Sequence, residues 1–73
     1  GSPYAKRQIM IRTLDIIRNI TQETGDDAFT NDIYSRALAL NPPIQPNEVD
    51  EAIQQLSQDT QIIMPYPGRW RVN

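Results

Sequence analysis

Residues 46–73, PNEVDEAIQQLSQDTQIIMPYPGRWRVN, contain the features that decide the fold of this chain. After Pro46, four apolar residues recur at helical spacing and form one face over two turns: Val49, Ala52, Ile53 and Leu56. Proline fits the first position of a helix, and Gln45 or Asn47 lies near the expected cap. The pattern predicts a helix from about Pro46 to Gln58, broken by Asp59-Thr60.

The segment that follows, residues 61–73, has the alternation that is typical of a β-hairpin. Side chains two positions apart share a face in each strand: Ile62 with Met64 in the first, and Trp70 with Val72 in the second. The turn is expected at residues 65–68, Pro-Tyr-Pro-Gly, because prolines and glycine suit a tight reversal. We expect Trp70 to lie in the core, because it alternates in phase with Val72.

Residues 5–24 carry an apolar stripe that predicts a first helix, ended by Gly25. The stripe consists of Ile9, Met10, Thr13, Leu14, Ile16, Ile17 and Ile20. Asp26 and Asp27 follow the glycine and are interpreted as exposed turn residues.

A second helix is predicted after a very short extended piece, Ala28-Phe29, and runs to about Leu40. Thr30 is expected to be its N-cap. The Asn-Pro-Pro sequence at residues 41–43 ends the helix, because a residue before proline avoids the helical region and proline has no N–H to donate. The residues expected to be buried in this helix are Ile33, Ala37 and Leu38.

These elements predict a mainly α fold with a small β-hairpin, in the order helix, short strand, helix, helix, hairpin. A lone hairpin is marginal in water, but over three helices, with residues 28–29 as a third strand, it closes a core. This arrangement is a winged helix-turn-helix, with three helices and a short β-wing. We expect residues 4–73 to form one such domain, and we interpret residues 1–3, Gly-Ser-Pro, as a cloning scar on an excised fragment.

The segment from Val49 to Val72 resembles the C-terminal winged helix of archaeal minichromosome maintenance (MCM) replicative helicases. Those domains similarly end in a helix, an isoleucine-bearing strand, a Pro-x-Pro-Gly turn and a short strand with aromatic and Arg residues. Residues 28–34, AFTNDIY, suit the start of that family's second helix. The resemblance implies a non-catalytic accessory domain of a hexameric, ATP-driven DNA helicase. Such a domain modulates helicase or ATPase activity through contacts with the catalytic and other domains of its parent, or with a replication protein.

Composition excludes several classes of function. The 73-residue chain has neither Cys nor His, which rules out disulfides and thiol chemistry and removes the commonest general base and metal ligand. We expect no catalytic residues, no metal and no cofactor, because no Gly-rich phosphate loop occurs and the acidic groups at 26–27 and 48–51 lack a pocket. No apolar stretch is long enough to span a bilayer, so no membrane partner is expected. The expected location is cytoplasmic and nucleoid-associated, or nuclear in a eukaryote.

The third predicted helix is the one that would enter the DNA major groove in a helix-turn-helix protein. Its outward residues include carboxylates and amides but no Lys or Arg, so the helix repels phosphates. First-turn carboxylates also complement the helix dipole, which is the structural interpretation of this face. The functional interpretation is a docking surface for a basic patch on a protein partner, formed by Glu48, Asp50, Glu51, Gln54 and Gln55.

The basic residues belong to other elements. Those of the first helix, Lys6, Arg7, Arg12 and Arg18, are interpreted as a solvated face that flanks a linker. Arg69 and Arg71 are interpreted as aids to solubility and edge-strand protection. The alternative function is that of a DNA-binding winged helix from a transcription or replication regulator, with weak phosphate contacts by the wing; its contact residues would be Arg36, Tyr66, Arg69 and Arg71. A third alternative, an oligomerisation domain, lacks a long exposed apolar stripe, so we expect the isolated domain to be a monomer.

Overall fold

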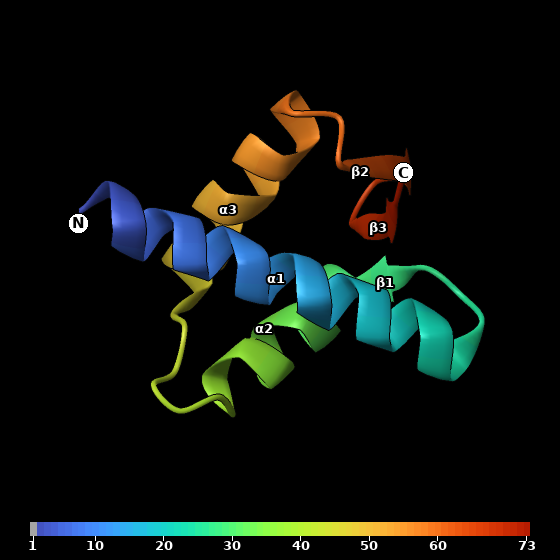
Figure 1. The fold of residues 1–73 in the computed structure, drawn as a ribbon. Helices are drawn as coiled ribbons and strands as arrows, with labels where there is room; N and C mark the ends of the chain where they lie inside the picture. The colour runs from blue at the N-terminus through green and yellow to red at the C-terminus, as the bar shows by residue number, and fades with distance from the viewer. Residues whose placement is uncertain (1) are drawn as a thin grey trace.

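The structure, a computed structural model, describes residues 2–73. It is mainly helical, with three helices and a small three-stranded antiparallel sheet (Figure 1). The predicted order of elements is confirmed, and so is the use of residues 28–29 as a third strand. The elements are α1 (Pro3–Thr24), β1 (Ala28–Phe29), α2 (Thr30–Leu38), α3 (Pro46–Gln58), β2 (Ile62–Tyr66) and β3 (Arg69–Val72).

Helix α1 begins two residues earlier than predicted, at Pro3. The Ser2 side chain caps it by accepting a hydrogen bond from the Ala5 N–H at 3.1 Å, and proline occupies the first turn. Gly25 ends the helix as predicted, in the left-handed conformation at φ 70°, and its N–H donates to the Thr21 carbonyl. The face that α1 buries consists of Thr13, Ile16, Ile17 and Ile20.

Helix α2 corrects two predictions. Thr30 is not the N-cap: Phe29 holds that position without a side-chain cap bond, and Thr30 is the first helical residue. Leu38 is 47% exposed rather than buried, because it lies one residue, or about 100°, past Ala37 on the helix face. The helix ends at Leu38 instead of about Leu40. Ile44, from the loop that follows, is buried in the core, and its N–H donates to the Ala37 carbonyl at 2.9 Å.

Helix α3 has the predicted bounds, and its four predicted apolar residues are all buried. Gln45 is the N-cap and forms a capping box with Glu48, in which the Glu48 carboxylate accepts from the Gln45 N–H at 2.9 Å. Pro46 occupies the first turn, as the sequence pattern indicates.

The sheet has the strand order β1-β3-β2, so β3 is the central strand. The interpretation of Arg69 and Arg71 as edge-strand protection is therefore wrong. Strand β2 extends through Tyr66, which pairs with Arg69 and leaves a shorter turn than predicted, Pro67-Gly68. Gly68 has φ 74°, in the left-handed region where a side chain is strained.

An irregularity in the pairing of β2 with β3 lies between Ile63 and Tyr66. Two β2 residues, Met64 and Pro65, lie there opposite Trp70 alone, so the strand bulges. Ile62 is fully buried, but Met64 is 51% exposed. The prediction that these two side chains share one face of the strand is therefore wrong.

The core lies where the three helices meet the inner face of the sheet (Figure 1). Its largest fully buried apolar side chains are Ile17, Ile33, Val49, Leu56 and Ile62. Trp70 is only half-buried and packs against this cluster from β3. Its indole N–H donates to the Thr30 hydroxyl at 3.0 Å, which in turn donates to the Gly68 carbonyl at 3.1 Å, so the hairpin is fastened to the start of α2.

Candidate interaction site

The five residues predicted to form a docking surface on α3 do not form one patch. Glu48, Glu51 and Gln55 line a groove between α3 and α1. Asp50 and Gln54 instead line a cleft between α3 and the sheet, together with Trp70. Sequence reasoning placed all five on the outward face of one helix. In the structure, α1 lies beside one part of that face and the sheet beside the other, so the five residues line two separate hollows.

Two of the predicted docking carboxylates are already used inside the domain. Glu48 completes the capping box at the start of α3. Asp50 accepts a hydrogen bond from the Tyr34 hydroxyl of α2, and this bond raises the pKa of Tyr34. Both carboxylates therefore have roles inside the domain: Glu48, in the first turn, caps its own helix α3, and Asp50 links α3 to α2.

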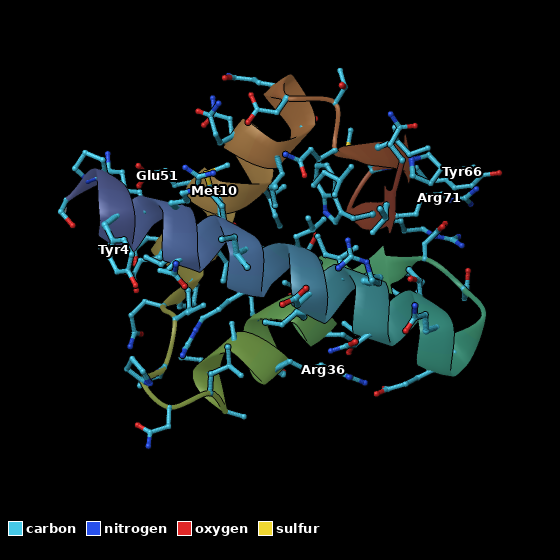
Figure 2. The ribbon with its side chains drawn as sticks, in the orientation of Figure 1. Tyr4, Met10, Arg36, Glu51, Tyr66 and Arg71 are labelled. Carbon is cyan, nitrogen blue, oxygen red and sulfur yellow. The ribbon has the colours of Figure 1, made fainter. Side chains whose placement is uncertain are left out.

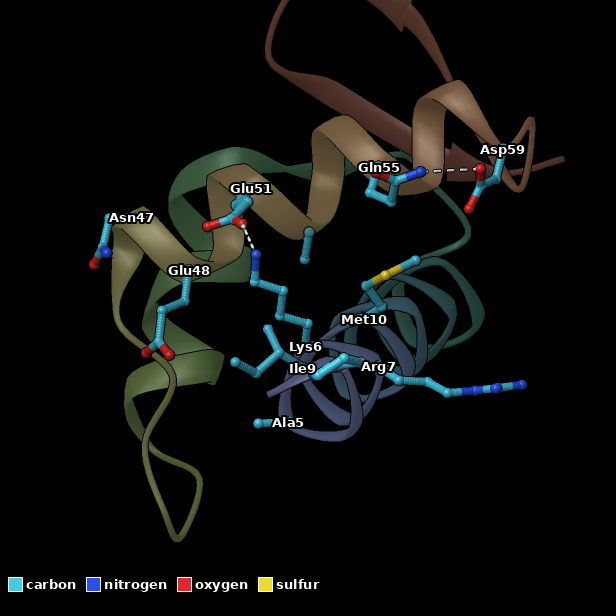
Figure 3. A pocket seen from close by; sticks show the side chains of 12 residues that line it. Ala5, Lys6, Arg7, Ile9, Met10, Asn47, Glu48, Glu51, Gln55 and Asp59 are labelled. Atoms are coloured by element: carbon cyan, nitrogen blue, oxygen red, sulfur yellow. Dashed lines mark hydrogen bonds and ion pairs between the residues drawn. The ribbon is translucent and has the colours of Figure 1, made fainter. Parts of the chain in front are cut away.

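The groove between α1 and α3 contains the third carboxylate, Glu51. Lys6 reaches across from α1 and places its ammonium 3.4 Å from the Glu51 carboxylate, as Figure 3 shows. Both side chains are more than half exposed, at 59% and 66%. Farther along α3, the Gln55 amide donates to the Asp59 carboxylate at 3.1 Å. Lys6 is therefore an ion-pair partner across the groove rather than a member of a purely solvated face.

We call this hollow the α1–α3 groove; its volume is about 590 Å³. Its apolar lining comes from Ile9 and Met10, which are half-buried against the core, from buried Ala52 and from exposed Ala5. The two walls carry opposite charges. Lys6 and Arg7 belong to α1, whereas the acidic residues Glu48, Glu51 and Asp59 belong to the α3 side.

The hollow continues toward the C-terminal end of α3. A second depression shares Arg7, Met10 and Asp59 with the first and adds Ile11 and Leu14 from α1. Ile11 is 45% exposed there. The α1 residues that line the two depressions run from Pro3 to Leu14, and eleven helical steps of 1.5 Å give the combined furrow a length of about 17 Å.

The predicted nucleic-acid contacts lie at the sheet and on α2, and the three arginines among them are paired with acidic side chains. Arg36 donates to the Glu23 carboxylate at 2.6 Å, and this bond lowers the pKa of Glu23 and raises that of Arg36. Arg71 donates to Asp27 at 2.7 Å, and Arg69 lies 3.0 Å from Asp26 and 3.1 Å from Asp27. In Figure 2, Arg71 and Tyr66 lie at the sheet, whereas Met10 and Glu51 lie toward the N-terminal end of α1.

Asp27 corrects the interpretation of residues 26–27 as an exposed acidic turn. Its side chain is only 3% exposed, and its two oxygens face the guanidinium groups of Arg69 and Arg71 on β3. The hydrogen bond from Arg71, aided by the charges of both arginines, holds the pKa of this carboxyl below its usual value although burial acts in the opposite direction. The cluster ties the loop after α1 to the central strand.

Arg69 is further held between two aromatic rings. Its guanidinium carbon lies 5.1 Å from the Phe29 ring centre and 5.0 Å from the Tyr66 ring centre, within cation–π range. Tyr66 remains 60% exposed, so one face of its ring meets Arg69 while much of the side chain lies in solvent. Three of the four predicted nucleic-acid contacts are thus engaged with carboxylates of this same domain.

Sequence reasoning missed Asp27 and the groove. An alternating Arg-x-Arg pattern in β3 and an acidic residue just before β1 would have indicated the ion pairs, had the two strands been aligned as neighbours. Ile9 and Met10, which line the groove, were assigned to the apolar stripe of the first helix. No local pattern shows that α3 leaves this part of the stripe uncovered.

Within residues 2–73, no group of three or more Asp and Glu side chains is placed to hold a metal ion. Each helix within the same range is too short or too polar to cross a membrane.

Comparison with known proteins gives no match, whether to a family model, to a curated protein or to a solved structure. The resemblance to MCM helicases therefore stays a prediction.

Proposed function

We propose that this chain is a winged-helix domain that binds other polypeptides and serves as a non-catalytic accessory domain of an MCM-type DNA replication helicase. In this assignment α2 and α3 form the helix-turn-helix unit, and the β2–β3 hairpin is the wing. The order of elements, the Pro67-Gly68 turn and the Arg- and Trp-bearing last strand support the assignment.

One observation carries the preference for a protein partner: the cations that would contact DNA are neutralised within the domain. Arg36, Arg69 and Arg71 are each paired with a carboxylate. The α3 helix itself has no Lys or Arg. Because affinity for duplex DNA depends largely on cations that neutralise phosphates, this surface offers little to a duplex.

The first experiment measures the isolated 73-residue chain against a fluorescent DNA duplex by anisotropy at 50 mM salt. We expect no saturable binding at protein concentrations up to about 100 μM. This limit is the weak end of the dissociation constants that are typical of non-specific DNA binding at physiological salt. Saturable binding that weakens steeply with salt would support the alternative, a DNA-binding winged helix that contacts phosphates through its wing.

The second experiment deletes this domain from the full-length helicase. We expect the ATPase or unwinding rate to change while the hexamer stays intact, because the domain acts on the catalytic domains without taking part in their assembly. Gel filtration checks the hexamer. Unchanged rates in the deleted enzyme would contradict the proposal.

A further inference from the structure

The α1–α3 groove has the lining of a helix-binding site. Its floor is formed by Ile9, Met10 and Ala52, and the adjoining depression adds Ile11, which is 45% exposed. Met10 is the most adaptable of these residues, since a flexible thioether chain moulds itself to different apolar partners. The floor therefore offers apolar area that this domain alone leaves partly in water.

The walls of the groove favour a helix over an extended peptide. An extended peptide gains affinity by pairing its main chain with free N–H and C=O groups. Both walls here are α-helices, whose main-chain groups are bonded internally, and the start of α3 is closed by the capping box. A helix needs only an apolar surface, and three turns of helix match the furrow's length of about 17 Å.

Charge sets how such a helix must lie. The α3 side of the groove presents Glu51 and Asp59, with Glu48 already engaged in the capping box, and the α1 side presents Lys6 and Arg7. We propose that the α1–α3 groove binds an amphipathic helix of a partner protein, with its apolar stripe on Ile9 and Met10, its basic edge along α3 and its acidic edge along α1. This inference rests on the proposed function, which it deepens by naming the surface and the kind of partner.

The ion pair between Lys6 and Glu51 closes the groove only weakly. Both side chains are more than half exposed, and exposed pairs of this kind contribute little to stability. A partner helix replaces the pair with two of its own, one from its basic edge to Glu51 and one from its acidic edge to Lys6. The two charges thus change partners without being left unpaired.

Three synthetic helical peptides of about 14 residues, long enough to fill the furrow, test the proposal. All carry the same leucine stripe; one has a lysine edge and a glutamate edge, one has two lysine edges, and one has two glutamate edges. Binding to the 73-residue chain is measured by anisotropy, and the site is mapped by amide chemical shifts of the ¹⁵N-labelled chain. We expect the mixed peptide to bind about fivefold tighter than either uniform peptide, with shifts confined to residues 5–14 and 48–59.

Arginine substitutions at two alanines, one inside the groove and one outside it, locate the site. Ala5→Arg places a long side chain in the mouth of the groove, where its bulk excludes the partner helix although its charge matches the acidic edge, whereas Ala39→Arg makes the same change on an exposed alanine at the end of α2. We expect Ala5→Arg to weaken the mixed peptide about tenfold and Ala39→Arg to change it less than about twofold. Circular dichroism confirms that both variants fold.

Four outcomes would overturn the groove assignment: no saturable binding of the mixed peptide, equal affinity for all three peptides, shifts that map to the sheet, or concentration-dependent shifts without peptide that reveal a second copy in the groove. In the full-length helicase, Ala5→Arg is expected to alter the rate in the same direction as deletion. A rate changed by deletion but not by Ala5→Arg would refute the groove and leave the proposed function standing. A rate that deletion leaves unchanged would refute the proposed function, while groove binding in the peptide assay would still support the helix site.

Discussion

Removing the acidic partners of the hairpin arginines, Arg69 and Arg71, should turn this domain into a weak DNA binder. Asp26 and Asp27 together neutralise Arg69 and Arg71. The double variant Asp26→Asn/Asp27→Asn keeps the shape of both side chains and releases two cations. If the wing then contacts two phosphates, the logarithm of the binding constant should fall with the logarithm of salt at a slope of about −1.8.

This slope gives a measurable magnitude. A fourfold rise in salt, from 50 to 200 mM, weakens a complex with that slope about twelvefold. The assay is anisotropy of a labelled duplex, repeated at four salt concentrations for the original chain and the variant. Trp70 is the only tryptophan of the chain, and its fluorescence reports whether the wing still packs on α2 after the substitution.

A matched control separates released cations from net charge. Asp32→Asn/Asp59→Asn also removes two negative charges, but neither of these carboxylates is ion-paired with a cation in residues 2–73. We expect this control to bind duplex no better than the original chain. A control as effective as the wing variant, or a slope near −1.8 already present in the original chain, would refute the reasoning that local ion pairs mask these arginines.

Three further predictions concern stability. Ile33→Ala removes a fully buried side chain and should lower the free energy of unfolding by about 2–5 kcal/mol, whereas Leu38→Ala, at an exposed position, should change it by less than about 0.5 kcal/mol; urea unfolding compares them. The lowered pKa of Asp27 stabilises the fold, and the full contribution is present above about pH 4, the usual pKa range of an aspartate. The contribution should disappear as the pH falls through the pKa of Asp27 in the folded state. Urea midpoints measured between pH 7 and pH 2 should therefore decline more steeply in acid for the original chain than for Asp27→Asn. Gly68→Ala should lower the free energy of unfolding by about 1–2 kcal/mol, because a side chain is strained at φ 74°. No clash adds to this cost, since the new Cβ meets only the Thr30 hydroxyl at 3.9 Å. A loss no larger than that of an exposed surface substitution would show that the turn tolerates a side chain.

The sequence predicts the helices well because their signals are local. Gly25 ends α1, Pro46 begins α3, and the buried face of α3 follows from spacing alone. These features depend on residues within one or two turns of each other. They hold wherever the helix is placed in the fold.

The errors concern residues whose environment is set by distant parts of the chain. Thr30 satisfies the rule for an N-cap, but its hydroxyl is engaged by Gly68 and Trp70 of the hairpin. Asp27 satisfies the rule for an exposed turn, but the pairing of β1 with β3 brings two arginines to it. No local pattern contains these neighbours, so sequence rules assign such residues by their commonest role.

Two of the ion-paired sites in this domain, Lys6–Glu51 in the groove and Arg71–Asp27 at the sheet, differ in how readily they exchange partners. At the sheet, Arg71 is 51% exposed but the Asp27 carboxylate only 3%, so a ligand that took Arg71 would leave a buried carboxylate without its hydrogen-bond donor. In the groove, Lys6 and Glu51 are 59% and 66% exposed, and water already competes for both. A ligand with complementary charges therefore replaces the Lys6–Glu51 contact at little cost. At the sheet, the same ligand would have to break the contact between Arg71 and a buried carboxylate. Exchangeable charges beside an apolar floor are the reason that we propose the α1–α3 groove, rather than the β2–β3 hairpin, as the surface for a reversible partner.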